Sequence, residues 1–236
     1  MSLAPQDRAR RSFVYRELAA LGAEFADVNG AACALTCGAA PEAEAERARE
    51  MAVCDLSPLP RAGFKGRETI PWLAAGGVSV SEDDNMAVVQ DDGARAARLA
   101  LGEVLLLSDL AATSRLIARL ANAWSPDPDP GTYPVPRDDT SCWFAISGRH
   151  GPGMLAKLCG VDLRPHRFAD GRIAQTSVAR LNAIVIRGDI GDLTVYHLLT
   201  DSAAASYMWS CVLDAMAEFG GAAVGLAALR GLNQGS

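Results

Sequence analysis

The sequence lacks several features that mark large classes of proteins. It carries 22 basic and 28 acidic residues among 236, and its net charge of −6 argues against the basic surface of a nucleic-acid-binding protein. No apolar run reaches the roughly 18 residues of a membrane span. Residues 6–12 are too polar for the apolar core of a secretory signal. We therefore expect a cytoplasmic protein with no nucleic-acid or membrane partner.

The chain also lacks the short motifs of common catalytic sites. It has no G-x-G-x-x-G loop, which a dinucleotide site needs before a helix, and no nucleophile elbow of a hydrolase. Cys33 and Cys37 would need two further ligands to hold structural zinc, and the three histidines are isolated. We predict no catalytic residue and no metal site. We expect the six cysteines to be reduced, with Cys33 in an Ala-rich loop, and His197 to lie on the surface or packed on a sheet.

The N-terminal segment, residues 1–58, is predicted to form helices and a first strand that pack on the core. Apolar residues recur on one stripe of residues 6–21, which predicts an amphipathic helix. Pro41 suits the first turn of a second helix, which runs to about residue 51.

Two later parts of the chain echo each other. Residues 146–161 resemble residues 64–78, and residues 198–206 resemble residues 106–114, in the same order and with an insertion between the two echoes in the later copy. A repeat of this length exceeds the roughly 20–50 residues of a solenoid unit. We therefore predict a chain made of two halves related by internal duplication.

Each half is predicted to run strand, helix, three strands, helix. Residues 59–124 form the first half and residues 138–219 the second. Asp91-Asp92-Gly93 between two strand-like runs indicates a hairpin turn. This order favours antiparallel sheets with helices on one face. We expect an α+β protein of two ferredoxin-like halves packed about a pseudo-twofold axis.

Two segments lie outside these halves. Residues 125–137 contain five prolines, a density that rules out a helix or a central strand and predicts an exposed linker. Residues 220–236 are rich in Gly and Ala, and we predict that they form a loosely held tail.

Several short sequence segments of the second half match a known protein family. They lie at residues 157–159, 162–165, 175–177, 196–199 and 213–219. With them, residues 157–219 resemble the gamma subunit of heterotetrameric sarcosine oxidase. That subunit is itself similar to the folate-binding part of the glycine-cleavage T-protein, an aminomethyltransferase, and residues 15–26 and 51–57 look like the T-protein's opening helix and first strand. The resemblance implies a fold like the T-protein's N-terminal domain, without its C-terminal barrel.

The resemblance also implies partners and cofactors. In that family, sarcosine oxidase oxidises N-methylglycine with flavins and passes the one-carbon unit to tetrahydrofolate. The flavin, NAD and folate sites belong to larger subunits, and the gamma subunit is a small partner without a known active site. We therefore expect a noncatalytic gamma-like subunit that binds no cofactor itself and whose partners are larger flavin- and folate-binding subunits.

The T-protein kinship leaves a folate site open. That family places a carboxylate just after a Gly turn. The corresponding turn here is Asp91-Asp92-Gly93, where Arg95 follows and the carboxylate is missing. The family's Arg-Thr-Gly-Tyr-Thr-Gly-Glu loop has its nearest match in residues 187–192. There Arg187 and Asp192 would hold a pterin edge if tetrahydrofolate binding is retained, and otherwise form a solvated hairpin.

Arg164, His166 and Arg167 surround Pro165 in an otherwise acidic chain. Because arginine recognises carboxylates through several planar donors, this loop is either a contact for an acidic partner or an ordinary solvated loop. Two other functions remain open for the whole chain. One is a stand-alone tetrahydrofolate-binding protein or aminomethyltransferase of the T-protein type, and the other is a homo-oligomer that binds something unrelated.

Overall fold

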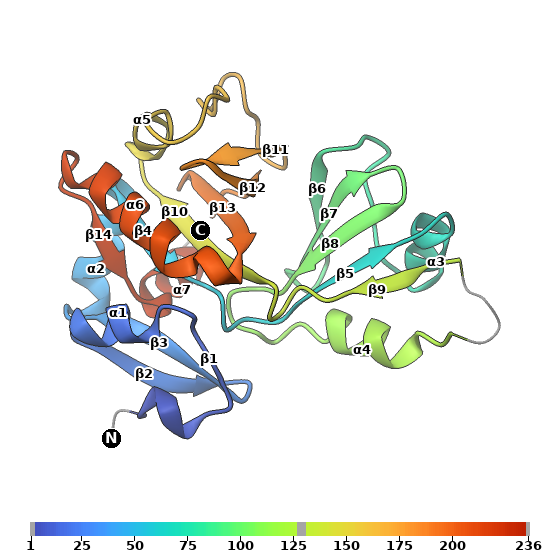
Figure 1. Ribbon diagram of the computed structural model, residues 1–236, viewed down its shortest axis with the longest axis horizontal. Coiled ribbons are helices and arrows are strands. Elements are labelled where there is room, and N and C mark those ends of the chain that lie inside the picture. The colour runs from blue at the N-terminus through green and yellow to red at the C-terminus, as the bar shows by residue number, and fades with distance from the viewer. Residues whose placement is uncertain (1–2, 127–130, 235–236) are drawn as a thin grey trace.

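The computed structural model describes residues 3–126 and 131–234, arranged as mixed α+β layers (Figure 1). In chain order the elements are a 3-10 helix Pro5–Asp7, β1 Arg10–Arg11, α1 Tyr15–Ala20, β2 Ala23–Val28, β3 Ala31–Cys37, α2 Pro41–Glu50, β4 Ala52–Asp55, β5 Arg61–Lys65, α3 Thr69–Ala75, β6 Met86–Val89, β7 Arg95–Ala100, β8 Glu103–Leu107, α4 Leu116–Ala123, β9 Tyr133–Val135, β10 Ser141–Ser147, α5 Gly151–Leu155, β11 Ile173–Val178, β12 Leu181–Arg187, β13 Val195–Asp201, a 3-10 helix Ser202–Ala204, α6 Ala205–Ala217, β14 Ala222–Val224 and α7 Leu226–Gln234.

Two large sheets form the centre of the molecule. One has the order β6-β7-β8-β5-β9 and the other β11-β12-β13-β10-β4-β14, and all their pairings are antiparallel except β14 with β4. The sheets face each other, with α3 and α4 on the outer side of the first and α5 and α6 on the outer side of the second (Figure 1). A third sheet, β1-β3-β2, lies beside α1 and α2.

The two halves have the same connectivity. Each runs strand, helix, three strands, helix, which confirms the predicted order, and in each the first strand lies beside the fourth. Descent of the halves from a duplication stays a prediction. The ferredoxin-like description is wrong in one respect, because that fold places its second helix before the last strand. Here the last three strands form a continuous antiparallel meander, and the helix follows it.

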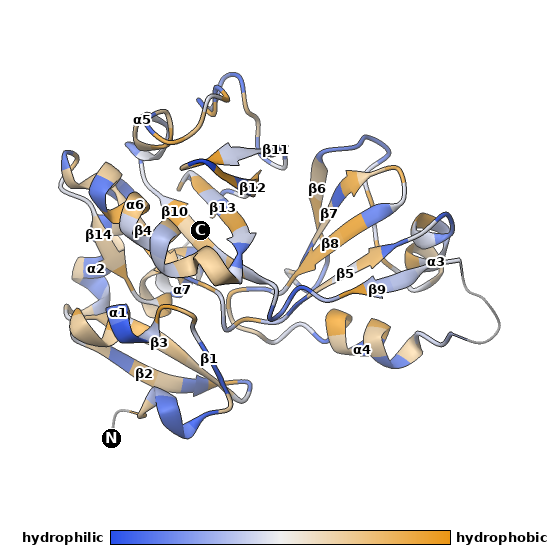
Figure 2. Ribbon diagram, in the orientation of Figure 1, coloured by the Kyte–Doolittle hydropathy of each residue, from blue (hydrophilic) through white to orange (hydrophobic). Residues whose placement is uncertain are grey.

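The central strands β8, β10 and β13 are buried on both faces, so they read as largely continuous apolar runs. In β8, Val104 and Leu106 point toward α3 and α4, whereas Leu105 and Leu107 point toward the opposite sheet. Figure 2 accordingly shows β8 and β10 hydrophobic along most of their length. The core between the sheets includes Trp143 of β10. It joins the two halves into one packed unit.

The N-terminal segment departs from the predicted helix over 6–21. Within that range only Tyr15–Ala20 is α-helical, because Arg10 and Arg11 pair as a short strand with β3. Cys33 lies in β3, not in a loop, and is buried. The β2–β3 hairpin turns at Asn29 and Gly30, which have φ of 53° and 81°. Asn-Gly is a strong hairpin signal that the sequence reasoning missed.

The predicted linker, residues 125–137, is in part a strand. Residues 127–130 lie outside the described part of the chain, but Tyr133–Val135 pairs with β5 at the edge of its sheet. An edge position accommodates Pro134, since proline has no backbone N–H to donate to a further neighbouring strand. Thr132 is fully buried, and its hydroxyl lies 2.8 Å from that of Thr69.

The predicted loose tail, residues 220–236, is wrong for the described residues 222–234. β14 extends the six-stranded sheet, and α7 buries Leu226 and Leu229 in the inter-sheet core. Gly225, which links β14 to α7, approaches β3 so closely that a Cβ would lie 2.0 Å from the Leu35 carbonyl oxygen. A glycine at 225 is therefore what lets the end of the chain dock. Residues 235–236 lie outside the described part.

Candidate functional site

A cavity of about 140 Å³ lies between the two large sheets. Its wall is mixed, with a guanidinium, an imidazole and a carboxylate set among apolar side chains. The Asp-Asp-Gly turn of the first half and the Gly-rich loop of the second, which the sequence resemblance singled out separately, meet here. The chemically informative lining residues are Arg95, Ser108, Asp109, Trp143, Ile190 and His197.

His197 is the most buried titratable group of this cavity, with 3% of its surface exposed. Strand alternation puts it on the face of β13 that meets the opposite sheet. The indole Nε1 of Trp143 donates a hydrogen bond to its Nδ1 over 3.1 Å, and its Nε2 has no partner within hydrogen-bonding geometry among the described residues. Burial, and then the Arg95 cation, lower the pKa of His197 to about 3, although a Gly188 backbone contact opposes this. The imidazole is therefore neutral, with its proton on Nε2.

Arg95 of β7 brings a cation into the same cavity. Its Nη2 donates to the Asp189 carbonyl oxygen over 3.3 Å, and it pairs with no carboxylate among the residues described. Burial lowers the pKa of Arg95, while Asp170 and Asp189 act in the opposite direction. A Cβ at Gly188 would lie 2.9 Å from both the Arg95 Cζ and the His197 Nε2. Only glycine at 188 therefore leaves room for the two side chains.

Asp109 lines the cavity, but its carboxylate is committed to the turn after β8. It accepts hydrogen bonds from the Ser108 hydroxyl, from the Thr113 amide and hydroxyl, and from the Ser114 amide, at 2.8–3.2 Å. Burial raises the pKa of Asp109, yet these hydrogen bonds outweigh it and the net shift is downward. A carboxylate stabilised in its charged form is a poor general base near neutral pH.

Arg187 and Asp192, the residues expected to hold a pterin, do not converge. Arg187 forms an ion pair with Asp189 at 2.6 Å, and its Nη1 donates to the Pro165 and Phe168 carbonyl oxygens. Asp192 is exposed. Arg187 thus braces the loop from within, and Ile190 is the loop residue that reaches the cavity. A folate role for Arg187 and Asp192 stays a prediction.

The loop predicted as a partner contact is exposed. Arg164, His166 and Arg167 all lie at the surface. Arg164 donates from Nε and Nη2 to the Asp162 carboxylate, at 2.8 and 2.6 Å, and these contacts hold the pKa of that carboxyl well below its usual range. Part of the predicted positive charge is therefore compensated within the chain.

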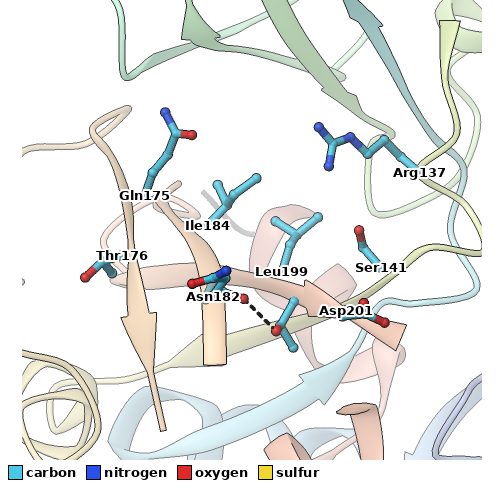
Figure 3. Close-up of a pocket in the computed structure, with 10 residues that line it drawn as sticks. Arg137, Ser141, Gln175, Thr176, Asn182, Ile184, Leu199 and Asp201 are labelled. Atoms are coloured by element: carbon cyan, nitrogen blue, oxygen red, sulfur yellow. Dashed lines mark hydrogen bonds between the residues drawn. The ribbon is translucent and has the colours of Figure 1, made fainter. Parts of the chain in front are cut away.

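A second, larger hollow of about 420 Å³ lies further along the same face of β13 (Figure 3). Arg137 and Gln175 reach toward it from its two sides. Gln175 Nε2 donates to the Asn85 Oδ1 and to the Leu99 carbonyl oxygen, which bridges the halves. Arg137 pairs with Glu103 at 2.8 Å. Gln175 and the terminal nitrogen of Arg137 are thus committed to these partners, whereas the Arg137 Nε is buried without a hydrogen-bond partner among the described residues.

Cys33 and Cys37 both lie in β3, where burial raises the pKa of each thiol to about 12. Within residues 3–126 and 131–234, no three His, Cys, Asp or Glu side chains gather closely enough to hold a metal ion. In the same part of the chain no helix is long and apolar enough to cross a membrane.

Sequence reasoning placed Arg95 beside the relevant turn and expected His197 on the surface or packed on a sheet; the structure shows it buried and packed on a sheet. The sequence did not reveal Trp143 as the hydrogen-bond partner of His197. The two residues are 54 positions apart and meet only because β10 and β13 are neighbours. No local pattern around either residue signals that contact.

Comparison with solved structures shows which known folds this chain resembles. No family model matches the chain, and no curated protein matches it. Among solved structures, the glycine cleavage system aminomethyltransferase T from Bartonella henselae superposes with a TM-score of 0.71 and 14% identity, over 95% of this chain and 62% of that one. A heterotetrameric sarcosine oxidase from Corynebacterium sp. U-96, in complex with pyrrole 2-carboxylate, superposes with a TM-score of 0.64 and 19% identity, over 90% of this chain and 97% of that one.

At these identities the likeness defines the fold: a mixed α+β fold similar to that of the T-protein. The chain spans about three fifths of the length of the aminomethyltransferase it superposes on.

Proposed function

We propose that this chain is a noncatalytic, gamma-like subunit of a heterotetrameric sarcosine-oxidase-type amine oxidoreductase of one-carbon metabolism. One observation carries the proposal: the likeness covers 90% of this chain and 97% of one chain from a heterotetrameric sarcosine oxidase. A match that nearly exhausts both chains pairs this protein with a subunit of similar length. The short sequence segments within residues 157–219 that resemble the gamma subunit also support this proposal.

The chemistry of the inter-sheet cavity supports a chain without folate-transfer activity. Arg95 stands near the position where the T-protein kinship implies a carboxylate, Asp109 is tied into its turn, and His197 is neutral and buried. Among the described residues that line the cavity, none is placed to accept a proton from a folate nitrogen. Flavin, NAD and tetrahydrofolate would then be held by larger partner subunits.

The role left to this chain is to dock on those subunits and fix their geometry. Arg167 is the exposed arginine of the 164–167 loop that pairs with no carboxylate among the described residues, whereas Arg164 is paired with Asp162. An acidic patch on a partner would find in Arg167 a planar, multidentate donor. His166 next to it adds a further polar contact.

Purification of the native complex through a tag on this chain tests the proposal. We expect larger flavoprotein subunits in fixed ratio, with flavin absorbance in the eluate. Arg167→Glu should lower their recovery, whereas Arg115→Glu, a charge reversal at an exposed site of the first half, should not. A colourless protein without partners would overturn the subunit assignment.

A second candidate is a stand-alone tetrahydrofolate-binding protein or aminomethyltransferase. It is favoured by the TM-score of 0.71 with the T-protein and by the meeting of the 91–93 turn with the 187–192 loop at one cavity. Titration of the isolated chain with tetrahydrofolate tests it, with Asp192→Ala and Arg187→Ala as variants. Asp192 is the cleaner test because Arg187 also braces its loop. Absence of binding at millimolar ligand would exclude this candidate.

A further inference from the structure

The cavity between β7 and β13 contains donors that the described residues leave largely unused. We infer that it binds a small organic carboxylate, held by the Arg95 guanidinium and the Nε2–H of His197. This site goes beyond the proposed subunit role and does not depend on it, because both donors belong to this chain and can be tested without partners.

The first donor is a largely buried cation. Within the described residues, Arg95 makes one long hydrogen bond, of 3.3 Å, to a carbonyl oxygen. The nearby carboxylates have other partners: Asp189 pairs with Arg187, Asp170 accepts from the Asp189 amide, and Asp109 accepts four hydrogen bonds in its own turn. A buried charge is costly unless an opposite charge or several acceptors compensate it. An anionic ligand supplies both the opposite charge and the acceptor oxygens.

The second donor is fixed by Trp143. Because the indole donates to Nδ1 of His197, the neutral ring carries its proton on Nε2. The Gly188 backbone lies against this nitrogen and acts to raise the pKa of the ring, but no described residue accepts from Nε2 in full hydrogen-bonding geometry. A buried donor without an acceptor destabilises the empty site. Nε2 lies on the same side as the Arg95 Cζ, since a Cβ on Gly188 would meet both atoms at 2.9 Å. The two donors therefore converge at Gly188.

The size and lining of the cavity narrow the ligand class. Its volume of about 140 Å³ is well below the roughly 300–1,000 Å³ of pockets for drug-sized ligands, so the ligand has only a few non-hydrogen atoms. The planar fork of an arginine matches the two oxygens of a carboxylate. Trp143, Ile190 and Leu110 in the wall suit a short apolar tail. Inorganic phosphate would bring more acceptor oxygens than these two donors satisfy.

Titration of the isolated full chain tests this site. Acetate, propionate and inorganic phosphate are added separately at constant ionic strength, while NMR follows the ring nitrogens of His197. We expect saturable shifts with acetate and propionate. Arg95→Gln should weaken binding roughly tenfold or more, the loss expected for one charge-assisted contact. Arg98→Gln, which removes another half-buried arginine from the other face of the same strand, should leave binding unchanged.

Three results would overturn the inference. One is the absence of a saturable shift in the unmodified chain, an outcome that does not depend on the folding of any variant. Another is an equal loss of binding in Arg95→Gln and Arg98→Gln. The third is saturation by phosphate in place of the carboxylates, which would assign the cavity to a different anion. None of these results bears on co-purification with partner subunits, so the two proposals fail separately.

Discussion

Trp143 donates its indole N–H to Nδ1 of His197 over 3.1 Å, across two neighbouring strands of the six-stranded sheet. The register pairs His197 with Ala145, so Trp143 is its diagonal neighbour on the same face. The ring centroids are 5.6 Å apart. This single contact sets the tautomer of a histidine that is buried between two sheets, and with it the character of the cavity.

Trp143→Phe should destabilise the protein by about 1–3 kcal/mol, because it leaves the buried Nδ1 of His197 without a donor. Urea unfolding measures this loss. The ring nitrogen shifts of His197 should also change, since neither nitrogen is then fixed as the protonated one. Trp72→Phe, a change at a half-buried indole on α3, should leave the His197 shifts in place. Unaltered shifts in Trp143→Phe would contradict the assigned tautomer.

The buried imidazole also predicts how stability depends on pH. The pKa of His197 is lowered from 6.5 to about 3 by burial and by Arg95. Between these values the unfolded chain takes up a proton that the folded chain refuses. Stability is therefore full above about pH 6.5 and falls as the pH drops toward 3, by at most about 1.4 kcal/mol per pH unit from this group.

The measurement is the free energy of unfolding at several pH values from 4.5 to 7, for the native chain and for His197→Gln. Carboxylates contribute to both curves and cancel in their difference. That difference should carry the slope assigned to His197. His166→Gln, a substitution in an exposed loop, should retain the native slope. Parallel curves for the native chain and His197→Gln would contradict the neutral buried histidine.

The two halves could be predicted from sequence because their strands carry strong local signals. Leu105 and Leu107 alternate with Val104 and Leu106 in a run that is apolar throughout, as a strand buried on both faces requires. The turn at Gly93 then joins β6 to β7, as its Asp-Gly signal indicates. Element order follows from such local patterns.

The docked C-terminal segment and the cavity could not be predicted in the same way. Gly and Ala in residues 220–234 give weak local signals, and the contact of Gly225 with Leu35 depends on tertiary placement. Arg95 and His197 likewise come from different halves, on strands whose facing is set by packing of the two sheets. Local periodicity carries no information about which distant face a strand will meet.

Arg61→Lys should destabilise the fold by about 3 kcal/mol or more. Arg61 is almost fully buried where the halves join, and its three guanidinium nitrogens donate to carbonyl oxygens that include those of Ser57, Arg137 and Ser141. Burial lowers its pKa to about 10, so it remains charged at neutral pH. A lysine ammonium cannot span acceptors on both segments, and a buried charge that loses partners is costly.

The midpoint of urea unfolding measures the effect of Arg61→Lys. Arg49→Lys, at an exposed position of α2, is the matched control, and we expect it to change stability by no more than about 0.5 kcal/mol. If both substitutions shift the midpoint equally, Arg61 does not join the halves as its hydrogen bonds indicate.

Glu44→Gln tests whether the C-terminal segment is integral to the fold. Glu44 is fully buried on α2; its Oε1 accepts from the amides of Cys37 and Ala39 at 2.5 and 3.3 Å, and its Oε2 accepts from the Gly225 amide at 2.7 Å. A glutamine must turn its NH₂ group toward one of these donors, so at least one contact becomes donor against donor. We expect a loss of about 1–3 kcal/mol in unfolding free energy and faster hydrogen exchange at Gly225 and along α7.

Glu42→Gln, on the exposed face of the same helix, removes the same charge and should change neither quantity. Equal behaviour of the two variants would mean that α7 is held by its apolar contacts alone, with no contribution from the Glu44 carboxylate.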